Sequence, residues 1–205
     1  MANVSLTTKK FRAAFVTLVE PESVLGGKVK YSVTMLFDKD DDEAMMQIRK
    51  AMHDVVKETW GPDKAKWPST LRNIDFKTYV SPNGKDGWPI RDGDTATWNG
   101  FAGCFFIKAS CNGEGPKAKP PVVVDRQRRP IMDRGVIEAG MICAAAIQVA
   151  TYDTNGNRGV TCYLSGVQLV EDDGVRYGSS FNADTAFAAW DDEDEATSFE
   201  DEAPF

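Results

Sequence analysis

The sequence predicts a mainly β protein, an OB-fold-like antiparallel barrel with one main helix, long inserted loops and a disordered acidic C-terminal tail. Several short runs that are apolar or alternate between apolar and polar residues, separated by Gly-, Asn- and Pro-containing turns, are typical of β-strands. Residues 40–60 alone show clear helical spacing, and carboxylates dominate residues 191–205. Five or more strands with one helix favour a closed barrel, and a β-sandwich is the alternative.

Length and composition indicate one globular domain followed by a tail. The chain has 205 residues, of which 42% are hydrophobic and 10% aromatic, enough to bury a sizeable core. We expect the domain to cover residues 1–180 and the linker and tail to cover 181–205. The N-terminus has no apolar signal-like segment, and no run approaches the roughly 18 apolar residues of a membrane span. These features predict a cytoplasmic protein without a membrane partner.

The first two strands are predicted as a hairpin. Phe11–Val19 is an apolar run that ends at Glu20-Pro21, and Gly26-Gly27 follows as a turn. Lys28–Phe37 then alternates, with its apolar residues on one face and its lysines and hydroxyl residues on the other. A period of two over this length is typical of a half-buried strand.

Residues 40–60 are predicted to form the main helix. Asp40 can cap it, with Glu43 three residues later, and Gly61-Pro62 ends it. The only histidine of the chain, His53, lies on this helix and is interpreted as an ordinary surface or half-buried imidazole. Apolar residues recur at helical spacing: Met45, Ile48, Met52, Val55 and Val56.

The remaining strands are expected in the second half of the chain. Leu71–Val80 and Cys104–Cys111 have strand character, and Val122–Val124 is a short apolar element. Gly140–Asp153 is apolar on both faces and should pair with Val160–Val170 through a hairpin loop that contains Asn155-Gly156. We expect a short packed helix over Phe181–Trp190, before the tail begins.

Enzymatic motifs are lacking. The sequence contains no Gly-x-Ser-x-Gly motif, no Walker loop and no Cys-x-x-Cys pair, which argues against a hydrolase, a nucleotide-binding loop and a zinc site. Of the four cysteines, Cys143 and Cys162 are most simply buried free thiols. We therefore expect no cofactor and no metal. A magnesium-dependent nuclease is a less favoured alternative, because carboxylates such as Asp75, Asp86, Asp92 and Asp94 could bind the ion.

Binding of single-stranded nucleic acid requires aromatic platforms for the bases and basic residues for the phosphates. Both occur together along this chain, and their joint pattern favours this function although any one aromatic residue could be core. The predicted stacking residues are Tyr79, Trp88, Phe106, Tyr152 and Tyr163. The predicted phosphate contacts are Lys77, Lys108, Arg126, Arg128, Arg129 and Arg158.

The tail carries most of the negative charge. The net charge is −7, from 24 basic and 31 acidic residues, and eight of the acidic residues lie in 191–205, leaving 23 against 24 in the body. Such a segment is expected to be disordered, and tethered to a cationic groove it can compete with DNA at high effective concentration. Its aromatic end predicts docking to partner proteins through Asp201, Glu202, Pro204 and Phe205.

Two segments resemble known families. The ending Phe-Glu-Asp-Glu-Ala-Pro-Phe resembles the acidic tip of bacterial single-stranded DNA-binding proteins. Residues 140–174 resemble a family of phage OB-fold single-stranded DNA-binding proteins long catalogued as a domain of unknown function. This resemblance implies single-stranded DNA as partner without sequence preference, and a role in phage DNA replication, recombination or repair inside the infected host cell. It also implies contacts to a polymerase or helicase through the tail.

Three alternatives remain open from the sequence. A single-strand annealing or recombination protein would share the basic groove but would also pair complementary strands. The magnesium-dependent nuclease is the second, and it would degrade its substrate. A structural protein with a merely solubilising tail is the third, and it would have no affinity for nucleic acid.

Overall fold

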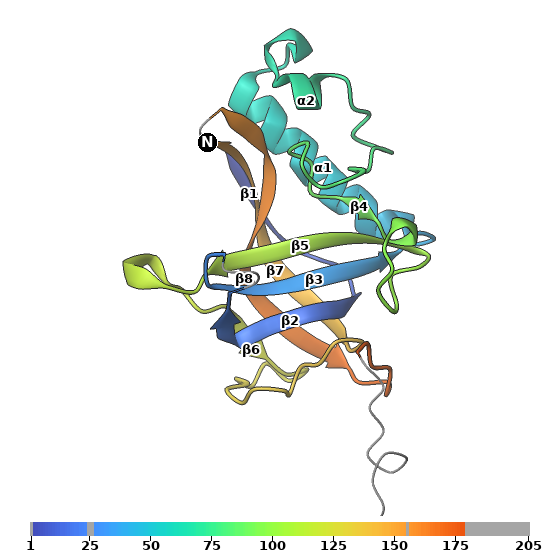
Figure 1. Cartoon of the computed structure of the whole chain (residues 1–205), viewed down its shortest axis with the longest axis vertical. Coiled ribbons are helices and arrows are strands. Elements are labelled where there is room, and N and C mark those ends of the chain that lie inside the picture. Colours follow the sequence, from blue (N-terminus) through green and yellow to red (C-terminus); the bar gives the residue numbers. More distant parts are fainter. Residues whose placement is uncertain (1, 24–26, 155, 179–205) are drawn as a thin grey trace, which may run out of the picture.

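The computed structural model describes residues 2–23, 27–154 and 156–178, and these form a mainly β domain (Figure 1). The two α-helices are α1 (Asp42–Trp60) and α2 (Ser69–Arg72), and short 3₁₀ turns occupy 64–66, 93–95 and 115–117. The strands are β1 (Asn3–Thr7), β2 (Phe11–Glu22), β3 (Lys30–Asp38), β4 (Arg91–Asp92), β5 (Cys104–Asn112), β6 (Val122–Val124), β7 (Ile142–Thr154) and β8 (Asn157–Glu171).

Five strands close into a ring, which confirms the predicted barrel over the sandwich. The order is β2–β3–β5–β8–β7, and β7 pairs back onto β2 at Phe11 and Cys143. All these pairings are antiparallel except β5–β8, where Ala109 lies opposite Cys162 in a parallel ladder. Strands β1, β4 and β6 extend the edges of β7, β5 and β8 respectively. Closure leaves the five barrel strands without a free edge.

The two predicted hairpins are both present. Strand β2 pairs with β3, and β7 pairs with β8 from Ile142 and Glu171 at one end to Thr154 and Asn157 at the tip. The short apolar element 122–124 is also a strand, β6, as predicted. Strand β1 was not predicted, although its exposed and half-buried residues alternate. The proposed helix over Phe181–Trp190 lies outside the described residues.

Strand β2 contains a bulge that the sequence pattern did not reveal. Its pairing with β3 slips between Ala14 and Thr17, and Phe15 within this interval has a φ of +47°. A bulge inserts an extra residue and reverses the alternation of the side chains that follow it. Phe15 therefore points to the solvent side of the barrel, where half of its surface is exposed (50%), although Phe11 and Ala13 point into the core.

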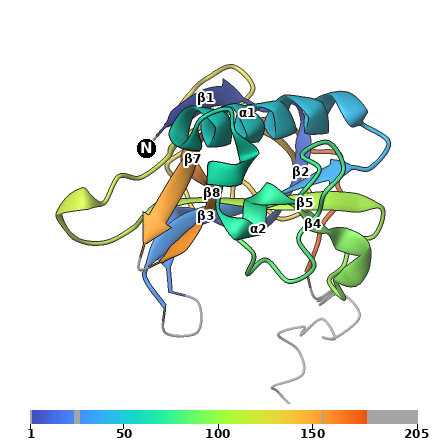
Figure 2. The same ribbon diagram turned by 90° about the horizontal axis from the view of Figure 1, so that it is seen from above.

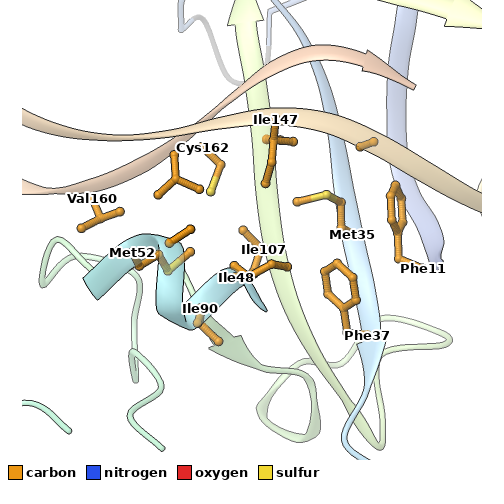
Figure 3. Close-up of a cluster of buried hydrophobic side chains, with 14 of the residues drawn as sticks. Phe11, Met35, Phe37, Ile48, Met52, Ile90, Ile107, Ile147, Val160 and Cys162 are labelled. Atoms are coloured by element: carbon orange, nitrogen blue, oxygen red, sulfur yellow. The ribbon is translucent and has the colours of Figure 1, made fainter. Parts of the chain in front are cut away.

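Helix α1 lies across the strands and closes the core of the barrel (Figure 2). Its cap is Asp41, whose carboxylate accepts from the Ala44 N–H at 3.1 Å, and the predicted cap Asp40 lies one residue before it. Buried side chains on the inner face of α1 meet those of the strands, as the close-up in Figure 3 shows. This core includes Ile48, Met52, Met35, Ile107, Ile147 and Cys162.

The prediction of a strand over Leu71–Val80 is wrong. Its first residues belong to α2, which Pro68 precedes, and the rest forms turns organised by Asp75. The Asp75 carboxylate accepts from the Lys77 N–H and the Thr78 hydroxyl, and the Asp75 carbonyl accepts from the Thr78 and Tyr79 N–H groups. These local hydrogen bonds give the backbone an alternative to a strand ladder. The alternating apolar residues Ile74 and Phe76 are buried without a partner strand.

Cys143 and Cys162 are buried free thiols, as predicted, and burial raises the pKa of each to about 12. Among the helices in the described ranges, none has the length and apolar character needed to cross a membrane.

Candidate nucleic-acid interface

One face of the β3–β5–β8 strands points away from the main core, and Lys108 and Tyr163 are its exposed residues. Lys108 of β5 lies opposite Thr34 of β3, and Ser110 of β5 lies between Ser32 of β3 and Tyr163 of β8. The alternate residues Val33, Met35, Ile107 and Ala109 are fully buried in the core. We call this surface the outer strand face, and it comprises Ser32, Thr34, Leu36, Phe106, Lys108, Ser110 and Tyr163.

An aromatic cluster covers one end of the outer strand face. The Phe106 ring lies beneath Phe101, with centroids 5.0 Å apart, and beneath Trp98, at 6.3 Å. Trp98 in turn meets Phe15 edge to face at 5.1 Å. The Arg91 guanidinium stands over the Phe106 ring, 4.6 Å from its centroid. Phe101 and Phe106 are buried and support the cluster from below. Phe15 and Trp98 are about half exposed and form its accessible surface.

A cavity of ≈ 930 Å³ opens beside this cluster. Its lining includes Phe15, Trp98 and Phe101 together with Arg134 and Arg176. Both arginines are already paired, Arg134 with Glu20 and Glu22, and Arg176 with Glu138 and Asp172. The cavity therefore offers aromatic surface rather than free positive charge.

Lys108 supplies positive charge in the middle of the outer strand face. Burial of its stem and the nearby Lys30 ammonium lower the pKa of Lys108. Within the described residues it has no carboxylate partner, unlike Arg158, which pairs with Asp153 at 2.7 Å. Because Lys108 lies near the Lys30 ammonium and lacks an anionic partner there, a bound phosphate would be attracted to both charges.

Phe106, Lys108 and Tyr163 are the predicted site residues that share the outer strand face. Tyr163 is 46% exposed and Lys108 is exposed, so a ligand can reach both. Phe106 is only 4% exposed, so it supports the aromatic cluster instead of presenting a free ring. The expectation that Phe106 is an exposed platform is therefore wrong.

Trp88 and Tyr79 lie elsewhere, beside α1. Trp88 is 1% exposed, and its indole N–H donates to the Tyr79 carbonyl at 3.1 Å. The predicted exposure of Trp88 is wrong, because the loop folds this ring onto Phe76 in the core. The half-buried Tyr79 donates its hydroxyl to Asp86 at 2.6 Å, and this bond raises the pKa of Tyr79 to about 12. Neither ring is presented on the outer strand face.

The other predicted residues lie in three places outside the outer strand face. Tyr152 and Arg158 line a hollow of ≈ 320 Å³ between the β7–β8 tip and Lys85. Arg126, Arg128 and Arg129 are exposed on the loop after β6. This loop is anchored to β8 by Gln168, whose side-chain amide donates to the carbonyls of Asp125 and Arg126, and Arg129 pairs with Asp125 at 2.6 Å. Lys77 is exposed beside α1.

The carboxylates considered for a nuclease have other partners. Asp92 and Asp94 both pair with the Lys39 ammonium at 2.6 Å, Asp75 organises its turn, and Asp86 accepts from Tyr79. In the parts of the chain that the structure describes, no three His, Cys, Asp or Glu side chains converge as a metal site would require.

The last described residues cross the aromatic end of the interface. The Arg12 guanidinium donates to both carboxylate oxygens of Asp173, at 3.1 and 2.7 Å, and the Tyr177 N–H donates to the Ala139 carbonyl. Gly100 lies so close to the Tyr177 ring that a Cβ there would be 2.3 Å from it. Gly178 lines the aromatic cavity. The predicted docking residues Asp201, Glu202, Pro204 and Phe205 lie outside the described residues.

Phe15 and Trp98 are the two exposed aromatic residues that sequence reasoning missed. The apolar run Phe11–Val19 predicts a regular strand that includes Phe15, and the bulge that exposes Phe15 leaves no clear mark in the sequence. Trp98 had a signal: it lies among Thr97, Asn99 and Gly100, a polar turn-rich context that favours exposure.

A closed five-stranded barrel that carries aromatic and cationic side chains on an outer face of its strands resembles the architecture with which OB-fold proteins bind oligonucleotides. The chain belongs to the family described as "Enterobacter phage Enc34, ssDNA-binding protein", which it matches over residues 4–197.

Three phage proteins are similar to this chain in sequence or in fold. The putative protein p50 of Acyrthosiphon pisum secondary endosymbiont phage 1 is 32% identical over 165 residues, which cover 78% of this chain and 80% of that protein. The single-stranded DNA-binding protein from bacteriophage Enc34, solved in complex with ssDNA, has a TM-score of 0.61 at 19% identity, covering 82% of this chain and 87% of that chain. The fold is also similar to gp2.5, a single-stranded DNA-binding protein of bacteriophage T7, with a TM-score of 0.56 at 15% identity over 99% of this chain and 100% of that chain.

Proposed function

We propose that the chain binds single-stranded DNA without sequence preference along the outer strand face. The observation that carries this proposal is the position of Lys108, a cation without a carboxylate partner in the described residues. It lies on the same face as Tyr163 and as the aromatic cluster that Trp98 and Phe15 complete. Membership of the Enc34 family supports the ligand class.

The arrangement suits a flexible single strand. Every base has a π-face, so the rings of Trp98, Phe15 and Tyr163 accept bases of any sequence, while Lys108 neutralises a phosphate. Arg91 over Phe106 keeps the aromatic foundation rigid and adds a second cation near the strand. The exposed Arg126 and Arg128 can extend the phosphate path from the far end of β8.

The acidic tail acts as a competitor in this proposal. Gly178, the last described residue, lines the aromatic cavity, so residues 179–205 begin beside the proposed DNA site. Its carboxylates occupy the cationic face when DNA is absent, at the high effective concentration that a tether provides. DNA displaces the tail, which then docks replication or recombination proteins of the phage through Pro204 and Phe205 in the infected cell.

A titration of fluorescent oligo-dT, with duplex of equal length as the control, tests the proposal. The full-length chain is compared with a chain that ends at Trp190. Strand-selective binding that tightens on truncation is the expected result. Equal binding by both chains would remove the competition but keep the site. An absence of binding by both would overturn the proposed function.

A further inference from the structure

The outer strand face continues along β8 to the tip of the β7–β8 hairpin. Alternate residues of a strand share one face, so Thr161 and Gly159 lie on the same side as Tyr163. Tyr152 of β7 lies directly opposite Gly159 and therefore also on this side. From Tyr163 to Arg158 the strand covers roughly 17 Å. The proposed DNA site thus leads to the hollow of ≈ 320 Å³ that Tyr152 and Arg158 line, and we call it the tip hollow.

The tip hollow joins the hairpin to α2, which lies at the same end of the domain (Figure 1). The hairpin packs directly on the loop that follows Lys85. The Val160 N–H donates to the Gly87 carbonyl at 2.8 Å, and a Cβ at Gly159 would lie 2.4 Å from the Gly87 carbonyl oxygen. Three exposed side chains that can donate to a phosphate also line the tip hollow: Ser69, Thr70 and Lys85. The surface is therefore continuous from β8 to α2.

A larger hollow lies beyond α2. It has a volume of ≈ 690 Å³ and separates α1 from the segment 72–77, and we call it the α1 hollow. Arg72, the last residue of α2, lines it, so α2 borders both hollows. Its floor is apolar, because Ile74 and Phe76 are nearly buried beneath it. A hollow of this size is large enough for a nucleotide base.

The floor of the α1 hollow is already rigid. The Phe76 ring packs edge to face against three other rings: His53 with centroids 4.9 Å apart, Trp88 at 5.1 Å and Trp67 at 5.4 Å. The Arg49 guanidinium donates to the Phe76 carbonyl and fixes the helix to this segment. A ligand would therefore meet a preformed surface and lose little affinity to ordering of the site.

The rim of the α1 hollow is positively charged. It carries one carboxylate, Asp75, which accepts from its own turn, and five cations: Arg49, Lys50, Lys64, Arg72 and Lys77. The lysines that form ion pairs in the described residues are Lys9, Lys39 and Lys50. Lys64 and Lys77 are exposed and have no carboxylate partner there, and the same holds for Lys85 in the tip hollow. Both hollows thus offer positive charge to a polyanion.

We propose that a bound single strand of DNA leaves the outer strand face at Tyr163, passes the tip hollow and reaches the α1 hollow. A base packs on the apolar floor there, and phosphates meet Lys85, Lys64 and Lys77. A DNA strand is favoured over an acidic peptide because cations follow the whole route from Lys108, as a backbone with a phosphate at every nucleotide requires. The inference rests on the proposed function and extends its site from the barrel to the helical side of the domain.

A comparison of two lengths of oligo-dT tests this inference with the full-length chain. Lengths of about 4 and about 16 nucleotides span the range of OB-fold sites, and the short oligomer fits on the outer strand face alone. Lys64→Gln with Lys77→Gln should leave the short oligomer unaffected and weaken the long one about tenfold. For the long oligomer, the slope of log affinity against log salt should fall by about 1.4, since each lost phosphate contact contributes about 0.7.

Lys85→Gln tests the route between the two surfaces. It should also weaken the long oligomer alone, with a fall in slope of about 0.7. Lys10→Gln with Lys57→Gln is the matched control for the double variant, since both lysines are exposed and neither lines a hollow. This control should bind both lengths like the unchanged protein.

Three results would overturn the inference. One is an affinity and salt slope for the long oligomer that the Lys64→Gln, Lys77→Gln variant leaves unchanged, and another is an equal loss for both lengths. Tighter binding of the long oligomer by this variant is the third, and it would assign the α1 hollow to the acidic C-terminal tail. Failure of the proposed function has a different signature, because Lys108→Gln would then weaken neither length.

Discussion

The rings of Phe15 and Trp98 meet edge to face with their centroids 5.1 Å apart, although one lies in a strand and the other in a distant loop. Phe15 reaches this position through a backbone conformation with φ of +47°, which costs a non-glycine residue about 1–2 kcal/mol. Strained residues of this kind cluster at functional sites. The pair leaves about half of each side chain exposed above two buried rings, an arrangement suited to stacking with a base.

Phe15→Ala and Trp98→Ala should each weaken binding of oligo-dT by roughly 1–3 kcal/mol, since each removes one face on which a base can stack. Fluorescence anisotropy at fixed salt measures the change, and circular dichroism shows whether the fold is kept. Val122→Ala, an exposed side chain on β6, is the control and should leave the affinity unchanged. Folded variants with unaltered affinity would remove the pair from the interface.

Lys108→Gln should weaken binding and also reduce its salt dependence. Each phosphate contact on a single strand contributes about 0.7 to the slope of log affinity against log salt, so this slope should fall by about that amount. Lys57→Gln, with the same charge change on α1, should leave the slope as it is. Equal slopes for the Lys108 variant and the unchanged protein would show that Lys108 contacts no phosphate.

The barrel could be predicted because its strands carry a local pattern. Lys28–Phe37 and the 140–170 hairpin alternate or are bounded by strong turns, and β3, β7 and β8 lie there. The segment 71–80 has similar alternation, but the hydrogen bonds of Asp75 outweigh it. Ile74 and Phe76 are buried by tertiary packing instead of strand pairing, and no local pattern reports that packing.

The candidate site was less predictable than the barrel, because tertiary packing decides which of its residues are exposed. Lys108 and Tyr163 lie on regular strands, and both are exposed there. Trp88 lies in a polar loop with basic neighbours, yet the loop folds back and buries the ring against Phe76. Phe15 is exposed only because a bulge changes the register of β2. Burial of a loop residue and bulges of a strand are both decided by distant parts of the chain.

Trp88→Phe tests this correction directly. Loss of the indole N–H leaves the Tyr79 carbonyl without its donor, and the smaller ring leaves a void beside Phe76, so the free energy of unfolding should fall by about 1–3 kcal/mol. Urea denaturation measures this loss. Oligo-dT affinity of the folded variant should stay unchanged. A reduced affinity with full stability would reinstate Trp88 as a stacking residue.

The anchor of the last described residues should be acid-sensitive. Hydrogen bonds from Arg12 lower the pKa of Asp173, and those from Arg176 lower the pKa of Asp172 to about 2. A carboxyl whose pKa is depressed in the folded state stabilises that state above its unfolded pKa of about 3.9, and this contribution is lost as the pH falls towards 2. The contacts of residues 172–177 should therefore be intact at neutral pH and weaken between about pH 4 and pH 2.

Amide hydrogen exchange at Tyr177, whose N–H donates to the Ala139 carbonyl, measures this anchor. Protection of Tyr177 should fall across that pH range, after correction for the intrinsic exchange rate, while the Val149 amide in β7 stays protected as the internal control. Asp173→Asn removes one of the two anchoring carboxylates, so it should lower the protection of Tyr177 already at pH 6 and flatten its acid response. If Tyr177 in this variant keeps the protection and acid response of the unchanged protein, the Arg12–Asp173 pair does not hold the chain end across the aromatic cluster.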